Sequence, residues 1–105
     1  MRLYAYTLNA VSGEIKETVV EVQEKEKSYK VERGYIPGAY ISLVRKADMP
    51  YLKNAYVSTE REPEAARKLF MDRTEWKYTR AVEEAGRLKA LKTAIENCRI
   101  KEAEP

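Results

Sequence analysis

Side chains able to perform acid–base or metal chemistry are scarce in this chain of 105 residues, which has no histidine and a single cysteine, Cys98. Histidine is the commonest general base and metal ligand, and it activates the nucleophile of serine and cysteine enzymes. A lone cysteine without histidine also leaves no structural zinc site. The four glycines are scattered, so no glycine-rich phosphate loop is present. We therefore expect no catalytic residues, no enzymatic activity and no cofactor.

The acidic residues do not suggest a metal site either. Glu21, Glu24 and Glu26 lie close together in the sequence, but lysines are interspersed among them. A carboxylate metal site needs clustered acidic residues in a loop. We interpret residues 23–27 as a solvated turn or strand end, and we expect no metal.

A basic helical face is the first candidate for partner binding. Residues three and four apart share one face of a helix, and this face combines basic residues with the chain's only tryptophan. Its members are Arg73, Trp76, Lys77, Arg80 and, further along, Arg87. Tryptophan and arginine are common at interaction hot spots. The alternative is a solvated face whose tryptophan anchors the helix on a sheet.

A second candidate combines tyrosines with basic residues in the first half of the chain. It consists of Arg33, Tyr35, Tyr40, Lys53 and Tyr56. Aromatic rings beside cations can stack on nucleic-acid bases, as they do on RNA-binding sheets. The glycine-containing aromatic motif of those domains is absent. The alternative is that these tyrosines serve the small core, because a tyrosine can bury its ring and keep its hydroxyl at water.

The bulk composition limits the class of protein. The net charge of +3 arises from 20 basic and 17 acidic residues, so the chain has neither a basic arm nor an acidic tail. This balance argues against a protein that imitates DNA. The single cysteine suits a reducing cytoplasm, and we expect Cys98 to be a buried apolar residue. Without a signal peptide or a membrane-length apolar run, we expect a soluble intracellular protein.

The first half of the chain is predicted to form strands. Alternating or β-rich segments occur at residues 1–9, 14–23, 28–31, 39–46 and 54–58. In the first of them, Tyr4, Tyr6 and Leu8 face one way, and we expect this strand to lie inside the sheet. A turn at residues 12–13 leads to the second strand. Pro37 and Gly38 match the central pair of a type II turn.

The second half is predicted to be helical from about residue 60 to 98. It is rich in strong helix formers, and Pro63 suits a first helical turn. Ser58, Thr59 and Glu62 resemble a capping box. The apolar face rotates along the tract, and residues 72–75 resemble a second capping box. We therefore predict two helices, at about 61–71 and 73–98, with a single long bent helix as the alternative.

Strands followed by helices indicate an α+β fold. We expect an antiparallel sheet of four or five strands, followed by two C-terminal helices, or one long bent helix, packed on one face. The chain would form a single domain, residues 1–105. The sheet would occupy about 1–59, the helical tract about 60–98 and a frayed tail 99–105.

Two passages of the sequence resemble small orphan proteins of bacterial phages and prophages. The first is the opening, residues 1–8, with its Ser-Gly turn and the following Val19–Val22 segment. The second runs from residues 54–59 into 65–70. The resemblance implies a stoichiometric inhibitor of host defence, as anti-CRISPR proteins are, acting in the cytoplasm of a bacterial host. Those proteins share no fold or motif, so no residue's role is carried over.

Three functions follow as expectations. The first is a non-enzymatic phage-type binding protein, in the manner of an anti-CRISPR inhibitor, that sterically blocks a CRISPR effector nuclease such as a Cas9-type effector. The second is an accessory protein that binds nucleic acid directly through the basic helical face. The third is a structural or assembly protein, a homodimer formed through Leu88, Leu91 and Ile95 of the helical tract. No membrane partner is expected.

Overall fold

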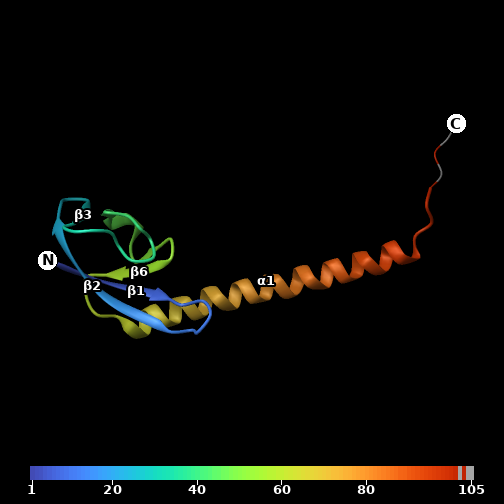
Figure 1. Ribbon diagram of the computed structural model, residues 1–105, viewed down its shortest axis with the longest axis horizontal. Coiled ribbons are helices and arrows are strands. Elements are labelled where there is room, and N and C mark those ends of the chain that lie inside the picture. Colours follow the sequence, from blue (N-terminus) through green and yellow to red (C-terminus); the bar gives the residue numbers. More distant parts are fainter. Residues whose placement is uncertain (102, 104–105) are drawn as a thin grey trace. The chain divides into compact units, whose positions relative to one another are not determined.

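The computed structural model describes residues 1–101 and 103, and it contains one sheet and one long α-helix (Figure 1). Six strands precede the helix α1 (Pro63–Asn97). They are β1 (Arg2–Leu8), β2 (Ile15–Glu24), β3 (Ser28–Val31), β4 (Leu43–Arg45), β5 (Tyr51–Leu52) and β6 (Ala55–Ser58). All neighbouring strands are antiparallel, in the order β4-β3-β2-β1-β6-β5. The α+β class and the antiparallel sheet are thus confirmed.

The strand β1 lies inside the sheet, as its sequence predicts. It pairs with β2 on one side, where Leu3 is opposite Val20, and with β6 on the other, where Tyr6 is opposite Tyr56. Its alternation matches the two faces of the sheet, since Leu3 packs on one face and Tyr6 on the other. Both faces are covered, which explains why β1 is apolar on both sides.

Two clusters of buried side chains hold the sheet together, one on each face. The larger cluster includes Leu3, Val22 and Val57 from the strands, and Ile36 from the loop between β3 and β4. The smaller cluster comprises Tyr6, Tyr56, Ala66 and Phe70, so the first turns of α1 cover this second face. The sheet therefore has a loop on one face and the beginning of the helix on the other.

The loop between β3 and β4 contains the predicted turn at Pro37 and Gly38. Gly38 has φ +85°, the positive value that a type II turn requires at this position. The turn closes one residue later than a type II turn, because the Tyr40 N–H donates to the Ile36 carbonyl at 2.8 Å. A Cβ at Gly38 would lie 2.6 Å from the Asn54 carbonyl oxygen, so glycine also permits the loop to pack against the β5–β6 turn.

The strands after this loop differ from the prediction. The segment 39–46 was expected as one strand, but β4 contains just Leu43–Arg45. Tyr40 has φ +55°, which is incompatible with an extended strand, and a short 3-10 helix begins at Lys46. The two-residue strand β5 was not predicted, because two residues carry no readable alternation. The sheet has six strands rather than four or five.

The prediction of two helices is wrong, and the alternative of one long helix is confirmed. The helix α1 continues through residues 72–75, where a second helix start was expected. A break would be needed if each apolar face of the helix were buried. Within α1 the buried residues are Ala66 and Phe70, so the rotation of the apolar face further along requires no interruption. Packing on the sheet is correspondingly limited to the first turns.

The predicted capping box at the start of α1 is also wrong. Ser58 is the last residue of β6, and its hydroxyl donates to the Glu60 carbonyl. The Glu62 carbonyl accepts the Ala66 N–H at 3.0 Å, so Glu62 directly precedes the helix. Pro63 is then the first helical residue, where its missing N–H costs nothing.

The chain divides into two compact units, Met1–Phe70 and a second from Met71 onward. The first unit contains the sheet and both buried clusters. In the second, every helical residue is exposed. Cys98 is exposed as well, so its prediction as a buried residue is wrong. The expected frayed tail at 99–105 lies partly outside the described residues.

Candidate binding surfaces

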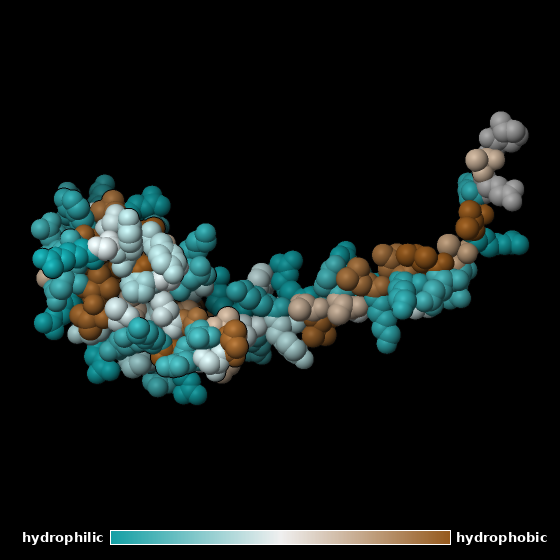
Figure 2. All heavy atoms as spheres, in the orientation of Figure 1, coloured by the Kyte–Doolittle hydropathy of each residue, from teal (hydrophilic) through white to brown (hydrophobic). Residues whose placement is uncertain are grey.

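The helical part of the second unit, Met71–Asn97, exposes large apolar side chains that a solvated helix does not need. The most prominent are Trp76, Tyr78, Val82, Leu88, Leu91 and Ile95, each between 52 and 69 % exposed. In its later half, hydrophobic side chains gather along one side of the helix and hydrophilic ones along the other (Figure 2). An apolar stripe left uncovered over several turns is typical of an interaction surface.

The basic face predicted from the sequence lies on this same exposed helix. The Arg80 guanidinium lies over the Trp76 ring, 4.9 Å from its centroid, in a cation–π contact. Trp76 is 58 % exposed, so the alternative in which it anchors the helix on the sheet is wrong. Arg87 donates two hydrogen bonds of 2.6 Å to the Glu84 carboxylate, which neutralises part of the face.

Charges of both signs alternate along this helical segment. Its basic residues are Arg73, Lys77, Arg80, Arg87, Lys89 and Lys92, and its acidic ones are Asp72, Glu75, Glu83, Glu84 and Glu96. The two sets nearly balance. A helix that binds nucleic acid through its phosphates concentrates cations on one face. The mixture here favours a protein surface over a nucleic acid.

The apolar residues follow a helical seam that can be traced by spacing. They are separated by three or four residues at each step, and within α1 they are Tyr78, Val82, Ala85, Leu88, Leu91 and Ile95. Three consecutive intervals of three residues, from Val82 to Leu91, shift the seam around the helix, as a three-residue insertion does in a coiled coil. The shift lies beyond residues 72–75, where the break between two helices was predicted.

The second predicted group is only partly brought together. Arg33, Tyr35 and Tyr40 lie on the loop between β3 and β4, with the two tyrosines 63 and 76 % exposed. Lys53 is exposed in the β5–β6 turn, against which this loop packs at Gly38. Tyr56 is 6 % exposed on the opposite face of the sheet, so its ring is not available for stacking on a base.

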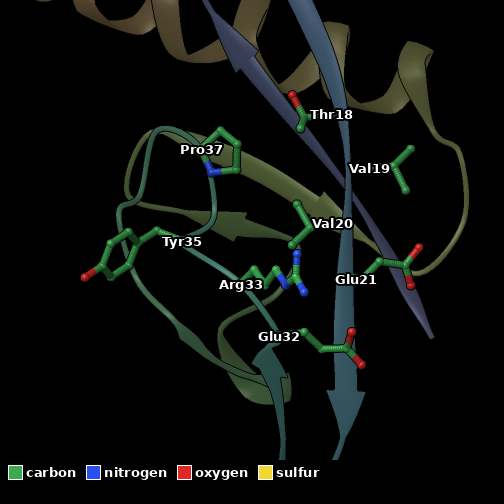
Figure 3. Close-up of a pocket in the computed structure, with 8 residues that line it drawn as sticks. All are labelled: Thr18, Val19, Val20, Glu21, Glu32, Arg33, Tyr35 and Pro37. Carbon is green, nitrogen blue, oxygen red and sulfur yellow. The ribbon is translucent and has the colours of Figure 1, made fainter.

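A groove lies beside β2 in the first unit, and it includes two residues of that second group. It has a volume of about 500 Å³. One wall is the strand, Thr18–Glu21, and the other is the loop bearing Arg33, Tyr35 and Pro37 (Figure 3). Sequence reasoning did not find this groove. The signal was the unequal length of the predicted strands at 14–23 and 28–31, because a long strand beside a short one leaves an unpaired edge.

A tyrosine–carboxylate network on the other face of the sheet was not predicted either. The buried Tyr6 hydroxyl donates to the Glu17 carboxylate at 2.6 Å and accepts the Glu62 N–H at 2.9 Å. The Tyr56 hydroxyl donates to the Glu62 carboxylate, and Arg61 forms an ion pair with Glu17. The network joins β1, β2 and β6 to the start of α1.

The same contacts shift the pKa of these groups. Burial, followed by the hydrogen bond to Glu62, raises the pKa of Tyr56 to about 12. Burial and then the hydrogen bond to Glu17 raise the pKa of Tyr6. The hydrogen bond from Tyr6 lowers the pKa of Glu17, aided by Arg61. Both phenols are therefore neutral hydrogen-bond donors at physiological pH, and their hydrogen bonds hold the strands to the start of α1.

Residues 1–101 and 103 contain no group of three or more acidic or cysteine side chains placed to hold a metal ion. Over the same residues, no helix combines the length and the apolar character needed to span a membrane.

Comparison with models of protein families, with curated proteins and with solved structures finds no match. Any statement about function therefore depends on the surfaces described above.

Proposed function

We propose that this chain is a non-enzymatic binding protein that self-associates through the exposed segment of α1. The observation that supports this proposal is the apolar seam of α1, which consists of Tyr78, Val82, Ala85, Leu88, Leu91 and Ile95. All six residues are exposed. Fully burying a leucine or isoleucine contributes about 1.5–3 kcal/mol, and the chain itself buries none of these.

The physics of isolated helices supports a partner for this segment. In most proteins a helix gains its stability from packing an apolar face rather than from propensity. Residues 71–97 have good propensity, but Gly86 and several threonines weaken it. Packing of the apolar seam against another helix would supply the missing stability.

A second copy of the chain is the partner that fits best. Two helices pair when their apolar residues recur every three or four positions, and a second copy presents the same seam with the same irregular interval. Small residues at 85 and 86 allow close approach of the two backbones. In a two-fold symmetric pair of helices, the seam of one copy would contact the same seam of the other copy.

Inhibition of a host defence nuclease, which the resemblance to phage proteins implies, is a further proposal about the partner of such a dimer. The basic face is the surface that would reach an acidic protein partner, and it shares no residue with the seam. Direct binding of nucleic acid is less favoured, because acidic residues are interspersed along the helix.

Replacing two residues of the seam tests self-association. Leu88→Lys combined with Ile95→Lys places charges in the apolar interface, and we expect the dissociation constant of the dimer to rise at least 100-fold. Sedimentation equilibrium over a range of protein concentrations measures it. The matched control, Lys77→Glu with Arg80→Glu, changes charge outside the seam and should leave association within about threefold. A wild-type chain that stays monomeric at millimolar concentration contradicts the proposal.

A further inference from the structure

The strand β2 is longer than the neighbours that cover it on one side. It has ten residues, of which Ile15–Glu21 pair with β1 and Val22–Glu24 pair with β3. One more hydrogen bond, from the Glu32 N–H to the Glu21 carbonyl at 3.0 Å, joins β2 to the residue that follows β3. Residues 15–20 of β2 therefore have a strand on one side only.

The direction of the main-chain groups of β2 follows from two hydrogen bonds. The Val22 N–H donates to the Met1 carbonyl at 2.9 Å, so even-numbered residues turn their polar groups toward β1. The Glu21 carbonyl accepts from Glu32, so odd-numbered residues turn theirs to the opposite side. The N–H and C=O groups of Glu17 and Val19 therefore point toward the side that carries no strand.

The loop after β3 leaves this edge open because the chain turns away at Gly34. This residue has φ +79°, a left-handed conformation that glycine adopts without strain. Arg33, Tyr35 and Pro37 then lie across the groove from Val20 rather than paired with β2 (Figure 3). The result is a groove with an unpaired strand edge as one wall and side chains as the other.

We propose that this open edge of β2 binds an extended peptide segment of a partner protein, which adds to the sheet as a further strand. Unpaired donors and acceptors at strand spacing are what such a peptide recognises, and side-chain pockets beside them give specificity. The site lies in the first unit and does not involve α1, so this proposal is independent of self-association.

The groove also indicates the sequence of the peptide. Side chains on one face of the added strand would meet Val20, Tyr35 and Pro37, so alternate positions should be apolar. Within the described residues, the Arg33 guanidinium forms no ion pair. An acidic residue of the peptide could pair with it, and a basic residue could pair with Glu32, which lines the same groove. The partner is therefore an extended segment with alternating apolar residues and an acidic residue near one end.

A displayed peptide library supplies the probe. Random ten-residue peptides on phage are selected on the immobilised full chain, and the best one is synthesised with a fluorescent label. We expect the selected sequences to share the alternating apolar pattern with an acidic residue. Amide exchange by NMR should show slow Thr18 and Val20 amides in the free chain, and at least tenfold protection of Glu17 and Val19 when peptide is added.

Two variants and one modified probe make the test specific. Val19→Pro removes an N–H that points to the open side, and we expect at least tenfold weaker peptide binding. Val19→Thr keeps that N–H and should bind within about threefold. Two peptides, N-methylated at odd or at even positions, extend the test to the wild-type chain. The peptide that loses the N–H groups facing β2 should not bind, and the other should bind normally. This comparison remains informative even if Val19→Pro fails to fold.

Several results would overturn the proposal. They are a selection that enriches no peptide, equal binding by folded Val19→Pro, equal binding by both N-methylated peptides, and protection confined to residues outside β2. Protection of Glu17 and Val19 that rises with protein concentration alone would assign the edge to a second copy of the chain instead. The Leu88→Lys and Ile95→Lys variant should bind the peptide normally, so failure of self-association and failure of this site are distinguishable.

Discussion

At the scale of single residues, the Tyr6 hydroxyl connects three parts of the first unit. Tyr6 belongs to β1, donates to Glu17 of β2 and accepts the N–H of Glu62, which precedes α1. Its ring contacts that of Tyr56 edge-to-face, with centroids 6.0 Å apart. Because Tyr6 is 1 % exposed, water cannot replace these hydrogen bonds. The start of α1 is thus fixed to the sheet by a neutral phenol.

The raised pKa of Tyr56 predicts a loss of stability at alkaline pH. A phenol whose pKa is about 12 when folded and about 10 when unfolded stabilises the folded chain fully below pH 10. That contribution, up to about 2–3 kcal/mol, disappears as the pH rises from 10 to 12. Urea unfolding at pH 8, 10 and 11.5 measures the decline, and phenolate absorbance reports the titration itself.

The Tyr56→Phe variant isolates this contribution from the titration of lysines. It should be less stable than the wild type at pH 8 and should lose less stability between pH 10 and 12. Tyr35→Phe, at an exposed position, is the matched control and should follow the wild type throughout. Parallel curves for wild type and Tyr56→Phe would show that Tyr56 does not titrate with folding.

At the scale of elements, the sequence predicts some strands correctly, but it predicts one strand and the course of the helix wrongly. The alternation of β1 assigned its faces correctly, because this strand is covered on both sides. The prediction of one strand at 39–46 was wrong because nothing in the sequence indicates the positive φ of Tyr40. The predicted break in α1 was wrong because, among the described residues, none covers the second half of the helix, so the apolar periodicity there does not reflect packing.

The binding surfaces were predictable to a similar degree. Spacing alone placed Trp76 and Arg80 on one exposed helical face. The burial of Tyr56 could not be foreseen, because a strand tyrosine looks the same whether a helix covers it or not. The unequal lengths of the predicted strands at 14–23 and 28–31 indicate an unpaired edge of β2, but the second wall of the groove depends on the turn at Gly34, which sequence spacing does not reveal.

Replacing each of three glycines by alanine should separate the effects of helix propensity, backbone strain and steric contact on the stability of the chain. Gly86→Ala in α1 meets no atom within 4 Å and should raise helix stability by about 0.5–1 kcal/mol. Gly34→Ala meets no atom either but has φ +79°, so it should cost about 1–2 kcal/mol. Gly38→Ala adds a clash with the Asn54 carbonyl and should cost more.

Thermal melts followed by circular dichroism at 222 nm suit Gly86→Ala, and urea unfolding suits the other two variants. The order of stability, rather than any single value, is the decisive result. If Gly38→Ala were as stable as Gly34→Ala, the loop would not pack against the β5–β6 turn as described.

At the scale of the whole molecule, the two units differ in what stabilises them. The first contains both clusters of buried side chains, with Phe70 as its last buried member. The second exposes every residue of its helix. Folding of the sheet should therefore not require residues beyond Phe70.

Truncation tests this independence. A chain ending at Asp72 should unfold in urea with a free energy within about 1 kcal/mol of the full chain, because it keeps every buried side chain. A chain ending at Glu62 loses Ala66 and Phe70, and removal of a buried phenylalanine side chain alone costs about 3–5 kcal/mol. Near-ultraviolet circular dichroism of the tyrosines is the signal, since Trp76 is absent from both fragments. Equal instability of the two fragments would contradict the division into units.

The position of β1 has a consequence for synthesis on the ribosome. This strand is synthesised before β6 and α1, yet its register with β6 joins Tyr4 to Ser58, and its second face is covered only when Phe70 is present. The nascent chain can form the β1–β2 hairpin early, but its tyrosine-bearing surface stays uncovered until Phe70 has been translated. Interruption of translation before Phe70 would release a fragment with that surface exposed, a natural substrate for chaperones and proteases.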